Sequence, residues 1–167
     1  GMLLAFTAVA ALCAKRRTEL GQHVDVSVRD LGSSFIGQSL LEYAMNGRET
    51  LRQGNRDDSA APQGVYRCQG EDEWVSISVG SQEEWRGFVE AMDSPQWAEG
   101  DKFGDAFRRW KHHDELDVLI QEWTAKHTPN EVTEKLQSHK VPSFPSLSPS
   151  QLRADLHLEA RGAFPTI

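Results

Sequence analysis

The opening segment of the chain predicts a helix that is apolar on every side. Its apolar residues leave almost no polar face: Leu3, Leu4, Phe6, Val9, Leu12 and Cys13. A helix of this kind is buried in a folded protein. The segment is shorter than the roughly 20 residues needed to cross a bilayer, and it lacks the basic start of a signal peptide. We therefore expect no membrane association, and we expect another subunit or a further part of the protein to cover this helix.

Length, charge and cysteine content narrow the class of protein. The 167 residues are enough for one domain with a core of its own. A formal net charge of −7 argues against a nucleic-acid partner, because nucleic-acid binders concentrate positive charge on one face. The two cysteines, Cys13 and Cys68, form no CxxC motif, which is typical of a reduced cytoplasmic chain.

Residues 1–47 predict a helix, a strand and a second helix. Gly21 ends the first helix, and the valines of His23–Val28 alternate onto one face of a half-buried strand. Asp30 is placed to cap a second helix that runs through Ala44 and ends at Asn46-Gly47. One strand cannot make a sheet, so this third of the chain looks like part of a larger α/β domain.

A polar loop over residues 48–63 precedes a predicted β-hairpin. Long loops of this kind are functional or mobile. The hairpin strands are expected over residues 64–68 and 74–79, where Val75, Ile77 and Val79 share one face.

Three capping boxes mark later helices: Ser81–Glu84, Thr128–Glu131 and Ser148–Gln151. One helix of about five turns is expected from Asp105 to Lys126, and residues 141–147 read as a proline-rich extended stretch. Together, these segments predict an α+β fold with more helix than strand.

No motif in the sequence carries chemistry by itself. GxSxG, Walker A and GxGxxG patterns are absent, and the carboxylates are scattered. His112 and His113 are adjacent on a predicted helix, so their side chains diverge by about 100° and cannot share a metal ion. We expect both to be solvated, and we expect no metal site.

Several blocks of sequence, in order, resemble the class III CoA-transferases. This family includes formyl-CoA transferases, carnitine CoA-transferases and 2-methylacyl-CoA racemases. The longest block is Gly21–Asp30, which reads GQHVDVSVRD. The others include AAL at 10–12, KRRT at 15–18, GNR at 54–56, VP at 141–142 and ARG at 160–162.

The resemblance implies an internal fragment of a two-domain transferase. Residues 1–47 would be the end of a large-domain segment, 48–63 a linker with an active-site loop, and 64–167 the small domain, which runs into the return segment. The family forms interlocked homodimers and binds acyl-CoA between its domains. It moves CoA between carboxylic acids through an aspartyl anhydride and an enzyme thioester, with the CoA thioester as substrate and no permanently bound cofactor. Its catalytic aspartate aligns before Leu3, so the resemblance assigns no catalytic residue to this chain.

The resemblance also gives candidates for contact with acyl-CoA: Asn55, Arg56, Pro62, Gly64 and Tyr66. Shaping the turn and packing the hairpin is the alternative role for Asn55, Arg56 and Tyr66. The family's glycine-rich loop is missing after Gly54-Asn55, which argues against close similarity to the oxalate and formate enzymes. Three functions remain open: part of an acyl-CoA transferase that is inactive alone, a 2-methylacyl-CoA racemase, or a non-catalytic binding or oligomerisation module.

Overall fold

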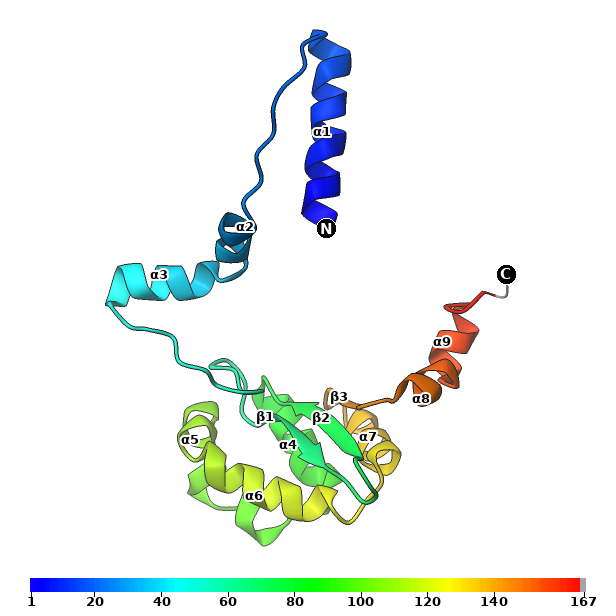
Figure 1. The fold of residues 1–167 in the computed structure, drawn as a ribbon. Coiled ribbons are helices and arrows are strands. Elements are labelled where there is room, and N and C mark those ends of the chain that lie inside the picture. Colours follow the sequence, from blue (N-terminus) through cyan, green and yellow to red (C-terminus); the bar gives the residue numbers. More distant parts are fainter. Residues whose placement is uncertain (166–167) are drawn as a thin grey trace. The chain divides into compact units, whose positions relative to one another are not determined.

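The computed structural model describes residues 1–165, and the chain divides into two units (Figure 1). Unit 1 is Gly1–Arg52, and unit 2 begins at Gln53. The sequence predicted different boundaries, at residues 47 and 63, for the domains of a two-domain transferase. Those boundaries stay a prediction.

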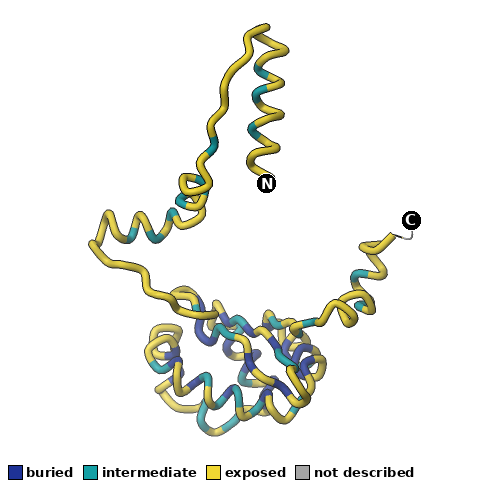
Figure 2. Tube along the Cα trace, in the orientation of Figure 1, coloured by how far each residue is buried: buried dark blue, intermediate teal, exposed yellow. Residues whose placement is uncertain are grey.

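Unit 1 consists of three helices without a core. They are α1 (Met2–Thr18), α2 (Val28–Phe35) and α3 (Gly37–Asn46). None of the three contains a buried residue, as the exposed and intermediate colours of Figure 2 show. The side chain of Phe6 in α1 is 69% exposed. The predicted helix is thus present, and the cover that we expect for it remains a prediction.

The predicted strand His23–Val28 is wrong for the described chain. Residues 21–27 have no regular structure, and α2 begins at Val28. A strand needs a neighbour that pairs with its N–H and C=O groups, and the one sheet in the described residues is built from other segments. The helix cap is also one turn earlier than expected, because Ser27 Oγ accepts the N–H of Asp30 at 3.3 Å.

The second predicted helix is divided in two. Ile36 leaves helical geometry, with φ −106° and ψ 25°, and separates α2 from α3. The predicted end is confirmed: Gly47 adopts φ 66°, a left-handed conformation that closes many helices and costs glycine little.

Unit 2 contains a three-stranded antiparallel sheet. Its strands are β1 (Gln63–Arg67), β2 (Trp74–Ser78) and β3 (Ser143–Pro145), in the order β1-β2-β3. The hairpin of β1 and β2 is confirmed, with Val65 opposite Ser76. The third strand comes from the proline-rich stretch that the sequence predicted only as extended.

Helices pack against one face of this sheet and form the core. They include α4 (Gln82–Ala91), α6 (His113–Thr124) and α7 (Pro129–Ser138) (Figure 1). The predicted alternation is confirmed, because Val75 and Ile77 of β2 and Val79, which follows it, are all buried among helix residues such as Phe88 and Leu116. All three capping boxes are present, at the starts of α4, α7 and α8 (Pro149–Arg153). The α+β class with a short antiparallel sheet is confirmed.

The predicted single helix from Asp105 to Lys126 is wrong. His112 separates two helices, α5 (Ala106–Lys111) and α6. Two short 3-10 helices, η1 (Gln96–Ala98) and η2 (Asp101–Phe103), precede α5. Backbone bonds continue across the break: the N–H of His112 donates to Arg108, and that of Leu116 donates to His112. The break therefore leaves the apolar periodicity almost unchanged. The last helix in the described residues is α9 (Leu156–Ala160).

Among the described residues, no helix has both the length and the apolar content required to cross a membrane.

Candidate functional site

A cleft of about 620 Å³ lies in unit 2 between the loop before β1, β1 itself and α6; we call it the α6 cleft. Four of the five predicted site residues line it: Asn55, Arg56, Gly64 and Tyr66. The fifth, Pro62, is buried and follows a cis peptide bond, and it is not part of the lining. From α6 and its C-cap Ala125, the lining residues are Asp117, Val118, Gln121, Glu122 and Ala125, whose spacing places them on one helix face. A ligand contact at these residues stays a prediction.

Asp117 holds together the three elements that build the cleft. Its Oδ2 pairs with the guanidinium of Arg56 from the loop, and its Oδ1 accepts the hydroxyl of Tyr66 from β1 at 2.7 Å. Arg56 makes a second ion pair, 2.7 Å long, with Asp114. Two carboxylates therefore offset the single positive charge at the cleft.

Tyr66 and Gly64 are matched to each other. A Cβ on Gly64 would lie 2.9 Å from the phenol ring of Tyr66, closer than real Cβ atoms approach a neighbour. The absence of a side chain at Gly64 therefore leaves room for the ring of Tyr66 against β1. Burial, reinforced by the Asp117 charge, raises the pKa of Tyr66. The phenol thus stays protonated and acts as a donor.

His113 is buried, so its predicted solvation is wrong. The break at His112 starts a new helix whose first residue faces β1, and His113 Nε2 accepts the N–H of Gln63 at 3.3 Å. The same nitrogen lies 3.5 Å from Asp117 Oδ1. Burial lowers the pKa of His113; Asp117 opposes that shift and Arg56 adds to it. A neutral ring is what the bond from Gln63 requires, because only an unprotonated nitrogen accepts.

Arg109 in α5 bonds the backbone at Ala61, shortly before β1. The residue is 1% exposed, and its guanidinium lies 4.7 Å from the ring of Trp85. Its Nε donates to the carbonyl of Ala61 at 2.8 Å, and its Nη1 donates to the carbonyl of Phe103 at 3.1 Å. The helical pattern alone could not reveal this role, because a buried arginine and a solvated one look the same in it.

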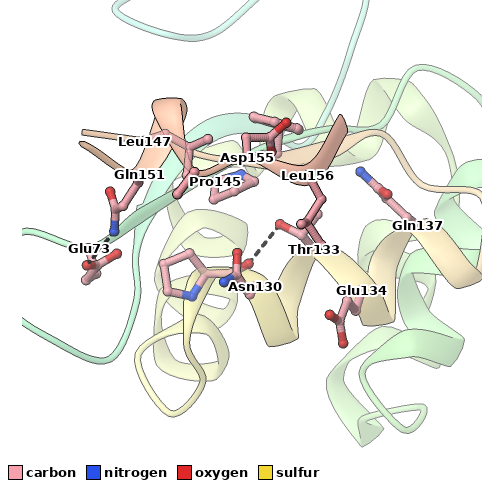
Figure 3. Close-up of a pocket in the computed structure, with 13 residues that line it drawn as sticks. Glu73, Asn130, Thr133, Glu134, Gln137, Pro145, Leu147, Gln151, Asp155 and Leu156 are labelled. Atoms are coloured by element: carbon pink, nitrogen blue, oxygen red, sulfur yellow. Dashed lines mark hydrogen bonds between the residues drawn. The ribbon is translucent and has the colours of Figure 1, made fainter. Parts of the chain in front are cut away.

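A second hollow, of about 480 Å³, lies between α7, β3 and the chain that continues into α9 (Figure 3). It contains none of the predicted site residues. Its carboxylates are Glu73, Glu134 and Asp155, and two of them already accept hydrogen bonds. Gln151 Nε2 donates to Glu73 at 3.4 Å, and the N–H of Leu158 donates to Asp155 at 2.8 Å. This hollow offers no nucleophile with an adjacent base.

No cluster of three or more histidine, cysteine, aspartate or glutamate side chains in the part of the chain that the structure describes could hold a metal ion.

Comparison with known proteins gives matches over nearly the whole chain. Residues 1–167 match the profile of CoA-transferase family III. The chain is 31% identical over 164 residues to a probable CoA-transferase of Mycobacterium tuberculosis, covering 98% of this chain and 20% of that protein. It is 28% identical over 157 residues to the succinyl-CoA–L-malate CoA-transferase alpha subunit of Chloroflexus aurantiacus, covering 94% of this chain and 36% of that protein.

The fold is also similar to a solved structure. A CAIB/BAIF family protein from Brucella suis superposes with a TM-score of 0.83 at 23% sequence identity. The match covers 97% of this chain and 42% of that chain. The chain thus spans between a fifth and about two fifths of the length of these similar proteins.

Proposed function

The chain belongs to CoA-transferase family III, and from this membership we propose that it is part of an enzyme that moves CoA between carboxylic acids. The resemblance seen in the sequence is thereby confirmed at the level of the family. The name of the Chloroflexus relative contains two dicarboxylates, succinate as the CoA ester and L-malate. We propose that donors and acceptors of this dicarboxylate class are the substrates of the protein.

The observation that carries the proposal is the convergence at the α6 cleft. Asn55, Arg56, Gly64 and Tyr66 come from a loop and a strand, and they meet the polar face of α6 in one hollow. A concave site with a few placed polar groups is the usual form of a small-molecule site. We propose that acyl-CoA lies against this cleft and that no cofactor is permanently bound.

The chemistry would come from a carboxylate outside residues 1–167. In the proposed mechanism that carboxylate attacks the thioester, a mixed anhydride forms and CoA thiolate leaves. The thiolate then attacks the anhydride, which gives an enzyme thioester and frees the donor acid. Asp117 is unsuited to this role, because both of its oxygens already accept hydrogen bonds, from Tyr66 and from Arg56. We therefore propose that this chain alone catalyses no transfer.

The racemase alternative needs an acid and a base on either side of an α-carbon. In the described cleft, Nε2 of His113 is occupied by Gln63 and Asp117 is occupied twice. The same contacts exclude Asp117 as a transferase nucleophile, so the cleft does not separate the two functions, and the names of the similar proteins are what favour transfer. Both thiols, Cys13 and Cys68, are free, in keeping with the proposed location in the reducing cytoplasm.

The test compares the 167-residue chain with a longer protein in which these residues are joined to the further segments that similar proteins contain. Each is incubated with succinyl-CoA and L-malate, and the CoA esters are separated and quantified. We expect new ester only from the longer protein. Deuterium exchange at the acyl α-carbon, measured in the same samples, detects a racemase. Transfer by the short chain that disappears in Asp25→Ala or Asp57→Ala would contradict the proposal, because it would place the nucleophile within these residues.

A further inference from the structure

The α6 cleft has a charge pattern that does not suit the phosphates of CoA. Arg56 is the one cationic side chain in its described lining, and it is already paired with Asp114 and Asp117. Glu122 is the second carboxylate of the lining, beside Asp117. The lining therefore holds two carboxylates, Asp117 and Glu122, against one guanidinium, and Asp114 pairs with that guanidinium from outside the lining, so the cleft has an excess of negative charge. A phosphate or a free carboxylate would enter at an electrostatic cost.

The rest of the lining is neutral, and it is amide-rich where it is polar. Asn55 contributes an amide side chain, and the amide of Gln63 accepts from Ser78 Oγ at 3.0 Å and donates to the carbonyl of Asn55 at 3.4 Å. Val65 and Val118 are 38% and 57% exposed. Gln121 is fixed in place: its Nε2 donates to the carbonyl of Arg67 at 2.7 Å and its Oε1 accepts the N–H of Arg67 at 2.9 Å. The open surface therefore offers amide groups beside two branched apolar side chains.

We propose that the α6 cleft takes the uncharged pantetheine arm of an acyl-CoA, while the nucleotide phosphates are held by other parts of the protein. The arm carries two amides, which match the amide side chains at the mouth of the cleft, and methyl groups, which match Val65 and Val118. The cleft volume of about 620 Å³ is ample for such a chain. In this assignment Arg56 does not bind phosphate. Its ion pairs with Asp114 and Asp117 fix the loop before β1 to α6. This inference rests on the proposed transferase function and names the part of the substrate that the cleft recognises.

The first experiment titrates the 167-residue chain with separate fragments of CoA and follows backbone amide resonances. The fragments are pantetheine and adenosine 3′,5′-bisphosphate. We expect pantetheine at roughly millimolar concentration to shift the resonances of Gly64, Val65 and Val118 until they saturate. Its affinity should change by less than about twofold between low and high salt, because no ion pair forms. The bisphosphate should leave these resonances in place. Shifts in the cleft caused by the bisphosphate, or none caused by saturating pantetheine, would overturn the inference.

Variants test the apolar side of the cleft. Val118→Glu adds a charge beside the proposed binding path and should weaken pantetheine binding by about tenfold, since burying an unpaired carboxylate is costly. Val118→Gln, which adds no charge, should weaken it less. Phe144→Glu is the matched control, because Phe144 is also an exposed apolar residue and lies outside this cleft. Thermal unfolding of each variant reports whether the fold is kept. Equal pantetheine affinity in Val118→Glu and the wild-type chain would contradict the assignment.

Failure of this inference and failure of the transferase function give different results. If the longer protein transfers CoA from succinyl-CoA but Val118→Glu leaves its KM for succinyl-CoA unchanged, the pantetheine assignment is wrong and the transferase function stands. If the longer protein transfers no CoA while the chain binds pantetheine in the cleft, the transferase function is wrong and the assignment stands.

Discussion

Asp117 connects more of the candidate site than any other single side chain, because one carboxylate accepts from Tyr66 and pairs with Arg56. The sequence could not point to it. A lone aspartate in the middle of a helical pattern is usually solvated, and the two partners lie 51 and 61 residues away along the chain.

Replacing Tyr66 with phenylalanine tests this connection. The variant loses the 2.7 Å bond to Asp117 and leaves the buried ring in place. We expect the free energy of unfolding to fall by about 1–2 kcal/mol, because a hydrogen bond to a charged group is lost. Denaturant titration measures the change. Tyr43→Phe is the matched control, since Tyr43 is exposed. An equal effect of the two substitutions would show that the bond contributes nothing.

The two cysteines should differ sharply in reactivity. Cys13 is exposed, whereas Cys68 is buried, and burial raises the pKa of the Cys68 thiol to about 11. Since the thiolate is the reactive form, Cys68 should be nearly inert near neutral pH. We expect an aromatic disulfide reagent to modify one thiol per native chain rapidly and the second only after unfolding. Cys13→Ser should remove the rapid phase; a rapid phase that persists in this variant would contradict the assignment.

His113 should make the stability of unit 2 depend on pH. Burial lowers the pKa of His113 in the folded chain, whereas a histidine in the unfolded chain titrates near about 6.5. Below that pH the unfolded state binds more protons than the folded state, so the free energy of unfolding should fall as the pH drops. His113→Gln should flatten this dependence between about pH 7 and pH 5. Urea titrations across this range measure it, with His139→Gln as the control at an exposed histidine. The same slope in all three proteins would exclude His113 as the cause.

At the scale of elements, α4 and α7 approach each other closely at Gly87. A Cβ at this position would overlap the backbone carbonyl oxygen of His139, which follows α7. Backbone cannot move aside as the end of a flexible side chain can. We expect Gly87→Ala to lower the free energy of unfolding by about 1–3 kcal/mol through overpacking. Gly100→Ala is the control, because nothing lies within 4 Å of the added methyl group there. Thermal unfolding compares the two, and equal midpoints would show that the helices can separate without cost.

The elements that the sequence predicted correctly are those with local signals. The capping boxes at Ser81, Thr128 and Ser148 and the alternating residues of β2 depend on side chains within a few positions of one another. The errors have distant causes. The valines before α2 alternate, but no neighbouring strand is described, and the break at His112 goes with the packing of His113 against β1. The family resemblance predicted four residues of the cleft, namely Asn55, Arg56, Gly64 and Tyr66. The contacts of Asp117, His113 and Arg109 join residues far apart in the sequence and could be seen only in the structure.

At the scale of the whole molecule, the two units differ in the amount of apolar burial that stabilises them. Unit 2 has a continuous core that includes Phe88, Leu116 and Leu136. None of the described residues of unit 1 is buried, so apolar burial does not stabilise it. A chain that begins at Gln53 should therefore unfold cooperatively at nearly the same midpoint as the full chain. Limited proteolysis of the full chain should remove unit 1 first, because cleavage follows local opening.

The exposed apolar surface of α1 leads to the last prediction, which concerns association. Leu4, Phe6 and Val9 are 60%, 69% and 59% exposed on a helix with no polar face before its basic last turn. Isolated proteins rarely leave contiguous apolar patches of more than several hundred Å² open to water. We therefore expect the 167-residue chain to self-associate as its concentration rises, in keeping with the homodimer that the family resemblance implies. Light scattering should give a mass above 18.7 kDa, whereas the double variant Leu4→Glu/Phe6→Glu and the chain that begins at Gln53 should remain monomeric. A monomer at every concentration, with α1 shown to be helical by amide exchange, would mean that this surface needs no partner.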